Sequence, residues 1–174
     1  MPLAMASPPE PPDTPTPLPA VERVCDYPRP PALRLSHQHV QIRALGEVLA
    51  DSHRSLQVLE TFHPPTVYLP PEAMQQQWLQ PAAGRSFCEW KGLASYCDVV
   101  VGERRLPRAV WRYCDPTPAF AALKGWYAVY PALMDGCWLD GEPVQPQPGG
   151  FYGGWITSAV QGPFKGDPAH PELI

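Results

Sequence analysis

Apolar and polar residues alternate in short runs along most of the chain after residue 39. Val40, Ile42 and Ala44 alternate with polar neighbours, which is the period-two pattern of a strand that buries one face. Comparable runs, rich in aromatic and β-branched residues, follow at close spacing and are separated by glycine and proline. They cover residues 48–50, 56–61, 67–69, 86–89, 94–101, 109–113, 126–130, 137–139 and 155–160. This pattern predicts a mainly β fold.

Helix signals are few. Residues 71–78 are predicted to form one short helix packed on a sheet, because proline and an acid suit its first turn. Met74 and Trp78 lie four residues apart and would share its buried face. Residues 119–123 are expected to add one helical turn. The prediction is therefore a strand-rich domain with one or two short helices.

Glycine and proline mark the places where strands end. Asp140-Gly141 is typical of a tight hairpin turn, and residues 102–107 are predicted to form a hairpin tip with exposed charges. Proline is also unusually frequent, with 26 of the 174 residues. A proline inside a helix costs roughly 3 kcal/mol, so this composition disfavours a helical bundle.

The prolines are concentrated near the N-terminus. Residues 1–24 are predicted to form a disordered tail, because their proline-rich segments favour polyproline II and bury little apolar surface. Residues 25–174 are predicted to form a single domain, since their number suits one ordinary domain.

Charge and cysteine content narrow the function classes. The net charge of −4 argues against a dedicated nucleic-acid binder, which needs a basic face. The chain has no apolar run of about 18 residues, so no membrane span is expected. The five cysteines are odd in number and lack the close pairs of a zinc site, and the N-terminus lacks a signal-peptide pattern. We therefore predict free thiols, no metal, no cofactor and a cytoplasmic location.

One segment could support thiol chemistry. Lys91 follows Cys88 by three residues and precedes Gly92, and an ammonium near a thiol favours the thiolate. Residues three apart on a continuous strand point to opposite faces, so the two side chains converge only if the chain bends here. The alternative is a buried thiol and an exposed lysine.

Two further patterns suggest a binding site. Glu60 ends an apolar strand close to Tyr68, and a carboxylate there needs a partner such as Arg54 or Lys91. A structural salt bridge is the alternative. Residues 146–155 hold four glycines and three aromatic residues, which would allow a ligand or another strand to approach closely.

Several motifs also match a known family. They are Asp26-Tyr27-Pro28-Arg29-Pro30-Pro31, Ala50-Asp51-Ser52, Leu59-Glu60-Thr61, Pro64-Pro65-Thr66-Val67-Tyr68-Leu69-Pro70, Phe87-Cys88-Glu89-Trp90-Lys91-Gly92, Tyr130-Pro131, Pro146-Gln147-Pro148-Gly149-Gly150-Phe151-Tyr152-Gly153-Gly154-Trp155 and Gly162-Pro163-Phe164-Lys165-Gly166. On these motifs the sequence resembles the bacterial family catalogued as domain of unknown function 427. The resemblance implies a β-tent fold with two small antiparallel sheets, similar to methionine sulfoxide reductase B and the ligand-binding domain of cereblon. Many such relatives hold zinc between paired cysteines, which this sequence lacks, and the family has no established activity to carry over.

Three functional hypotheses follow. The first is a small molecule bound in an aromatic-lined pocket between the sheets. Its predicted lining is Glu60, Tyr68, Cys88, Lys91, Tyr96 and Tyr152, with Trp111 and Trp155 as walls. The second is an enzyme with Cys88 as nucleophile or redox thiol, Lys91 stabilising the thiolate and Glu60 moving protons. The third is a protein-interaction module that uses the proline-rich tail or exposed aromatic residues. The ligand and the oligomeric state do not follow from the sequence.

Overall fold

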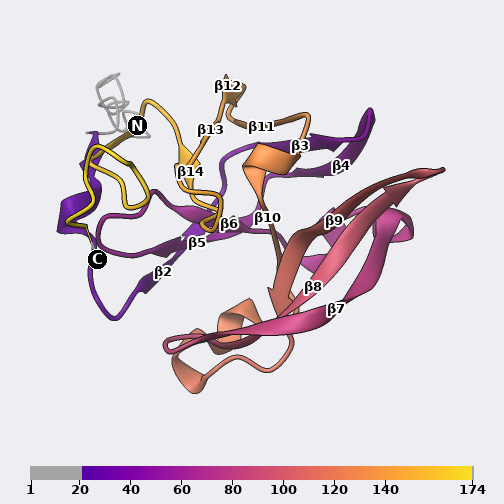
Figure 1. Ribbon diagram of the computed structural model, residues 1–174, viewed down its shortest axis with the longest axis horizontal. Coiled ribbons are helices and arrows are strands. Elements are labelled where there is room, and N and C mark those ends of the chain that lie inside the picture. Colours follow the sequence, from indigo (N-terminus) through magenta and orange to yellow (C-terminus); the bar gives the residue numbers. More distant parts are fainter. Residues whose placement is uncertain (1–20, 174) are drawn as a thin grey trace, which may run out of the picture.

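Antiparallel strands dominate the computed structural model, which describes residues 21–173 (Figure 1). One sheet has the order β10-β9-β8-β7 and contains β7 (Leu79–Cys88), β8 (Gly92–Val101), β9 (Arg104–Tyr113) and β10 (Tyr127–Val129). A second has the order β2-β5-β6 and contains β2 (Ala32–Ser36), β5 (Ser55–Leu59) and β6 (Thr66–Tyr68). Leu69 and Tyr127 exchange two backbone hydrogen bonds of 2.8 Å each. This bridge joins the two sheets along β6 and β10.

A third sheet lies against the joined sheets. Its order is β12-β11-β3-β4, and it contains β3 (Val40–Ala44), β4 (Glu47–Ser52), β11 (Gly136–Leu139) and β12 (Glu142–Pro143). Two small pairs complete the strands: β1 (Glu22–Arg23) runs parallel to β15 (Val160–Gln161), and β13 (Gln145–Pro146) pairs with β14 (Trp155–Ile156). In Figure 1 strands β3 and β4 lie above strands β7, β8 and β9, and the two groups approach each other towards the right-hand side.

The alternation of side chains gives the joined sheets two different faces. Val67 and Val110 point into the main core, which also contains Ile42 and Leu49 of the opposing sheet. The next residue along each strand, Tyr68 or Trp111, belongs to a separate aromatic cluster on the other face. A one-residue step in a strand reverses the face, so the two faces follow directly from the sequence pattern.

The helices of the described residues are short 3-10 turns. They are η1 (Val24–Asp26), η2 (Pro71–Ala73), η3 (Gln76–Trp78), η4 (Pro118–Leu123) and η5 (Pro131–Leu133). The single helix predicted over residues 71–78 is wrong, because Met74 has an extended backbone with ψ 142°. Met74 is buried and Trp78 packs on the same core, as expected for a segment that covers a sheet. None of these helices is long and apolar enough to cross a membrane.

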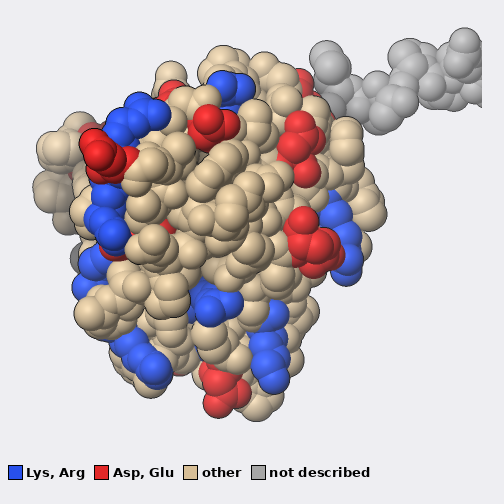
Figure 2. Space-filling model, turned by 90° about the vertical axis from the view of Figure 1, so that its right-hand side faces the viewer, with Lys and Arg blue, Asp and Glu red and all other residues tan. Residues whose placement is uncertain are grey.

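The mainly β prediction is confirmed, with five sheets rather than two among residues 21–173. The prediction of a disordered tail is wrong for residues 22–24: Glu22 and Arg23 form β1, and Val24 is fully buried. Residues 1–20 of that predicted tail lie outside the described residues. The hairpin tip predicted over residues 102–107 is also shorter, because β9 already begins at Arg104. Figure 2 shows basic and acidic side chains interspersed on the right-hand face of the molecule.

Candidate functional site

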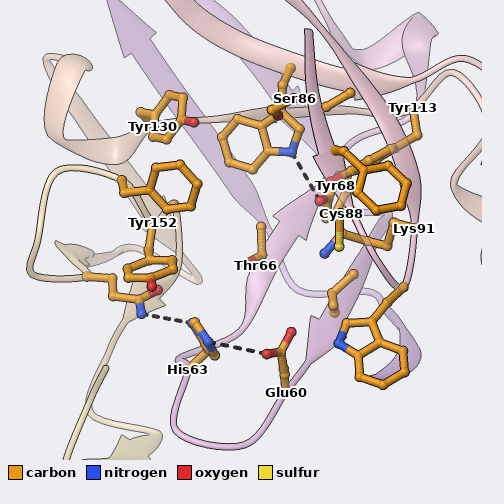
Figure 3. Close-up of a pocket in the computed structure, with 18 of the residues that line it drawn as sticks. Glu60, His63, Thr66, Tyr68, Ser86, Cys88, Lys91, Tyr113, Tyr130 and Tyr152 are labelled. Carbon is orange, nitrogen blue, oxygen red and sulfur yellow. Dashed lines mark hydrogen bonds and ion pairs between the residues drawn. The ribbon is translucent and has the colours of Figure 1, made fainter. Parts of the chain in front are cut away.

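A cavity of about 370 Å³ lies on the aromatic face of the joined sheets (Figure 3). Its wall combines side chains from β5 to β9 with the segments around residues 60, 90, 150 and 165. The lining residues are Val58, Glu60, His63, Thr66, Tyr68, Ser86, Phe87, Cys88, Glu89, Trp90, Lys91, Ala94, Tyr96, Trp111, Tyr113, Tyr130, Gln147, Phe151, Tyr152, Gly153 and Lys165. Seven of the eight predicted site residues are therefore at one cavity. Figure 3 shows Tyr130, Tyr152 and His63 on one side of it and Cys88, Lys91 and Tyr113 on the other.

The β7–β8 hairpin brings Cys88 and Lys91 together. Cys88 ends β7 and pairs with Gly92, which begins β8 at a φ of 105°, so the chain reverses direction between them. A φ in this region strains any residue with a side chain, which explains the glycine. Thr117 holds the turn by donating its N–H to the carbonyl of Lys91 at 3.0 Å. The bend that convergence requires is present, and both side chains line the cavity.

Hydrogen bonds hold the aromatic wall in place. Trp111 Nε1 donates to the phenol oxygen of Tyr68 at 3.1 Å, and the hydroxyl oxygens of Ser86 and Tyr96 are 2.7 Å apart. Burial raises the pKa of Tyr68, and the same cause raises the pKa of Tyr113 and Tyr130. These phenols therefore keep their protons at neutral pH and meet a ligand as hydrogen-bonding groups, not as anions.

A hydrogen-bonded chain leads from the protein interior to Glu60. Gln147 is buried, and its Oε1 accepts from Gly154 N–H at 3.2 Å while its Nε2 donates to the Lys165 carbonyl at 2.9 Å. This orientation directs the other Nε2 proton to His63 Nδ1 at 3.0 Å. His63 Nδ1 is thus the acceptor, and His63 Nε2 carries the proton that faces Glu60 Oε2 at 3.4 Å. Both imidazole nitrogens are occupied, so His63 positions Glu60.

Glu60 is ionised at neutral pH. Burial raises the pKa of its carboxyl, but the hydrogen bond and attraction of His63, with the charges of Lys91 and Arg29, outweigh burial and lower the pKa below its ordinary value. Arg29 Nε lies 3.5 Å from Glu60 Oε2. Of the two countercharges expected for Glu60, Lys91 acts on it, whereas Arg54 lies over the ring of Trp126 at 5.2 Å from its centre.

Two lysines carry positive charge at the cavity. Lys91 Nζ lies 5.7 Å from the centre of the Tyr113 ring, and Lys165 Nζ lies 5.4 Å from the centre of the Tyr152 ring. Within residues 21–173, neither ammonium forms an ion pair with a carboxylate. Their strongest contacts are with ring faces, which leaves N–H donors for an anionic ligand.

Trp155 is the predicted wall residue that the structure places elsewhere. It is 1% exposed and packs in the main core between the sheets, so its assignment to the cavity is corrected. The neighbouring Gly153 explains the glycine-rich motif in part, because a Cβ there would overlap the ring of Trp111. The close approach is to the protein's own aromatic wall.

No metal site is formed by the part of the chain that the structure describes, where no three His, Cys, Asp or Glu side chains are suitably grouped. All five cysteines are free. Cys97 and Cys137 are buried in the main core, and burial raises the pKa of Cys137 to about 12. Cys88 is the thiol that reaches the cavity.

A family model described as Domain of unknown function (DUF427) matches residues 32–140. The chain belongs to this family. A search of the curated proteins gives no match. The DUF427 segment contains Glu60, His63, Cys88 and Lys91, together with the strands that hold the aromatic wall. The rest of the cavity, including Gln147, comes from the chain after that segment.

Several cavity residues have no signal in the sequence. His63 follows Glu60 by three residues in a loop, a spacing without meaning for a strand, and its other partner Gln147 lies 84 residues further on. Tyr113 resembles many other aromatic residues of this chain. Tyr130, Gln147 and Lys165 belong to motifs that carry the family resemblance, which is the indication that could have identified them.

Proposed function

We propose that this DUF427 protein binds a small molecule that combines a planar aromatic face with an anionic group. The observation that supports this most is the pair of ammonium groups, Lys91 and Lys165, set beside aromatic rings in one cavity, neither in an ion pair with a carboxylate of residues 21–173. An anion that reaches these lysines exchanges water for charge-assisted hydrogen bonds.

The aromatic wall supplies the second part of the recognition. Tyr68, Tyr96, Trp111 and Tyr130 present ring faces and edges to the cavity, and Trp111 is fixed by its bond to Tyr68. Each aromatic contact with a planar ligand contributes about 0.5–1.5 kcal/mol beyond burial of its area. A ligand with a flat aromatic ring system should therefore bind more tightly here than an aliphatic ligand of the same charge.

Glu60 limits the orientation of the ligand. Its Oε2 is engaged by His63 and Arg29, so Oε1 is the oxygen that can accept a hydrogen bond from a ligand hydroxyl or N–H. We infer a ligand that carries a hydrogen-bond donor in addition to its anionic group. A cytoplasmic location remains part of this proposal and rests on the free cysteines.

Thermal unfolding with a simple probe tests the binding proposal. Saturating β-naphthoate, which has a planar body and one carboxylate, is expected to raise the unfolding midpoint of the full chain by about 5 °C. Neutral naphthalene methanol should produce a much smaller rise, and Lys91→Ala should remove most of the β-naphthoate effect. Lys124→Ala is the matched control, because Lys124 is exposed and outside the cavity lining. Equal shifts with the two compounds, or in the two variants, would exclude the proposal.

Cys88 supports a second candidate function, that of a thiol enzyme. The thiol shares the cavity with the Lys91 ammonium and with the ionised Glu60, which could remove a proton from a bound group. Alkylation by iodoacetamide at neutral pH tests it. A Cys88 rate well above that of the exposed Cys114 supports catalysis, and a rate no higher than that of Cys114 rejects it.

A further inference from the structure

A second cavity, also of about 370 Å³, adjoins the first. The two cavities share Tyr96, Tyr130, Gln147, Phe151 and Tyr152, and the second adds Arg108, Ala132, Leu133 and Gly150. We propose that the second cavity is a subsite for a second anionic group of the same ligand, with Arg108 as the residue that binds it. This inference rests on the proposed function and specifies its ligand as an elongated planar dianion.

The guanidinium of Arg108 is held on an aromatic surface between the two cavities. Its carbon Cζ lies 4.1 Å from the centre of the Tyr96 ring, and Tyr96 lines both cavities. A guanidinium carries five N–H donors, so donors remain for a carboxylate or phosphate that approaches it. Within residues 21–173, the protein acceptor that this side chain contacts is the Ala83 carbonyl, at 3.5 Å from Nη1.

Asp98 forms no ion pair with this guanidinium. The carboxylate accepts the backbone N–H of Arg108 at 2.8 Å on Oδ1 and pairs with the side chain of Arg105 through Oδ2. No ion pair between Arg108 and a carboxylate occurs within residues 21–173. The charge of Arg108 is thus available to an anion in the second cavity.

Two backbone irregularities position the Arg108 guanidinium over the Tyr96 ring. Arg108 has a φ of 50°, a left-handed conformation that side chains rarely adopt, at the register shift between β8 and β9. Gly84 has a φ of 91° at the register shift between β7 and β8, and a Cβ there would lie 2.7 Å from Arg108 Nη1. Arg108 therefore reaches from β9 across Tyr96 of β8 to the glycine of β7. Arg108 is the strained residue of the two, because glycine adopts a positive φ freely, and strained residues cluster at binding sites.

The shared residues connect the two positive regions. Lys91 lines the first cavity, Arg108 lines the second, and the rings of Tyr96 and Tyr130 line both. A ligand that fills both cavities would place one anionic group near each cation and its planar body along these rings. Aromatic dicarboxylates, and aromatic carboxylates that also carry a phosphate, belong to this class.

Two probes separate the subsite from the first cavity. Titration calorimetry compares β-naphthoate with the naphthalene dicarboxylate that carries its groups at opposite ends of the ring system. The wild-type protein should bind the dicarboxylate about tenfold more tightly, the gain expected of one charge-assisted contact. Arg108→Gln should reduce this ratio to about two while leaving the affinity for β-naphthoate unchanged.

Arg85→Gln is the matched control, since Arg85 is exposed on β7 and lines neither cavity; it should retain the tenfold ratio. Gly84→Ala should reduce the ratio as Arg108→Gln does, because the new methyl group displaces the guanidinium. Far-ultraviolet circular dichroism checks that each variant is folded. If β-naphthoate binds through Lys91 but the second carboxylate adds nothing in the wild type, the subsite is wrong and the proposed function stands. If neither probe binds, both are wrong.

Discussion

The indole of Trp111 on β9 and the phenol of Tyr68 on β6 are joined by a hydrogen bond of 3.1 Å within the buried aromatic cluster. The two residues come from two sheets that the Leu69–Tyr127 bridge joins. Their contact ties these sheets together and sets the rear wall of the cavity. Stability and the shape of the cavity therefore depend on the same pair.

Tyr68→Phe is predicted to destabilise the protein by about 1–3 kcal/mol, because it leaves the buried Trp111 N–H without its acceptor. Urea unfolding measures the change in free energy. The double variant Tyr68→Phe with Trp111→Phe should lose less free energy of unfolding than the two single variants lose together, since both hydrogen-bond partners are then removed. Strict additivity would contradict a direct coupling between the two residues.

Trp155→Ala is predicted to cost about 3–5 kcal/mol, the range for emptying a large core position. The side chain is almost fully buried in the main core. Trp90→Ala provides the comparison. Because Trp90 is partly exposed at the cavity, its replacement should reduce the free energy of unfolding clearly less. Similar losses for the two variants, measured by urea unfolding, would show that Trp155 is not a core residue.

Ligand protection of thiols is predicted to be selective. In native protein treated with iodoacetamide, β-naphthoate should slow alkylation of Cys88 and leave that of the exposed Cys114 unchanged. Cys97 and Cys137 should react slowly throughout, because burial raises the pKa of both thiols. Peptide mass spectrometry follows each site. Equal protection of Cys88 and Cys114 would place the ligand elsewhere or show a general effect on stability.

Glu60→Gln is predicted to reduce stability by about 1 kcal/mol at neutral pH through loss of the ionised partner of His63. The folded-state pKa of Glu60 lies below its ordinary value of 4.5, so ionised Glu60 stabilises the fold above that value. This contribution disappears as the pH falls through the lower, folded-state pKa. The difference between wild type and variant should therefore shrink in urea unfolding series taken down to about pH 3.

Glu89→Gln is the control for this series, since Glu89 is exposed on the same cavity. Its stability difference from the wild type should be close to zero at every pH. A Glu60→Gln difference that stays constant, or that grows towards acidic pH, would contradict the favourable environment of the Glu60 carboxylate.

Strand β3 was predictable because Val40, Ile42 and Ala44 bury one face, which imposes a period of two on the sequence. The convergence of Cys88 and Lys91 was predictable on the condition that the chain bends between them, and Gly92 permits that bend. The hydrogen bond between His63 and Gln147 was not predictable, because the two residues are 84 positions apart and their contact depends on how two loops meet. Arg108 was missed for a different reason: its placement depends on a left-handed backbone that its residue type does not signal.

Trp155 shows a further limit of sequence reasoning. An aromatic residue beside glycines has the same pattern whether it walls a cavity or fills a core. The pairing of β13 with β14 turns Trp155 towards the core, while Tyr152 and Gly153 of the same motif remain at the cavity. Only the strand register decides between the two positions.

Diffraction from a crystal soaked in bromo-β-naphthoate tests ligand binding in the first cavity, because the anomalous signal of bromine locates the ligand. One bromine is expected between the rings of Tyr96 and Tyr130, with the carboxylate in hydrogen-bond contact with Lys91 or Lys165. A bromine elsewhere on the surface, or a carboxylate turned away from both lysines in an occupied cavity, would contradict the binding proposal.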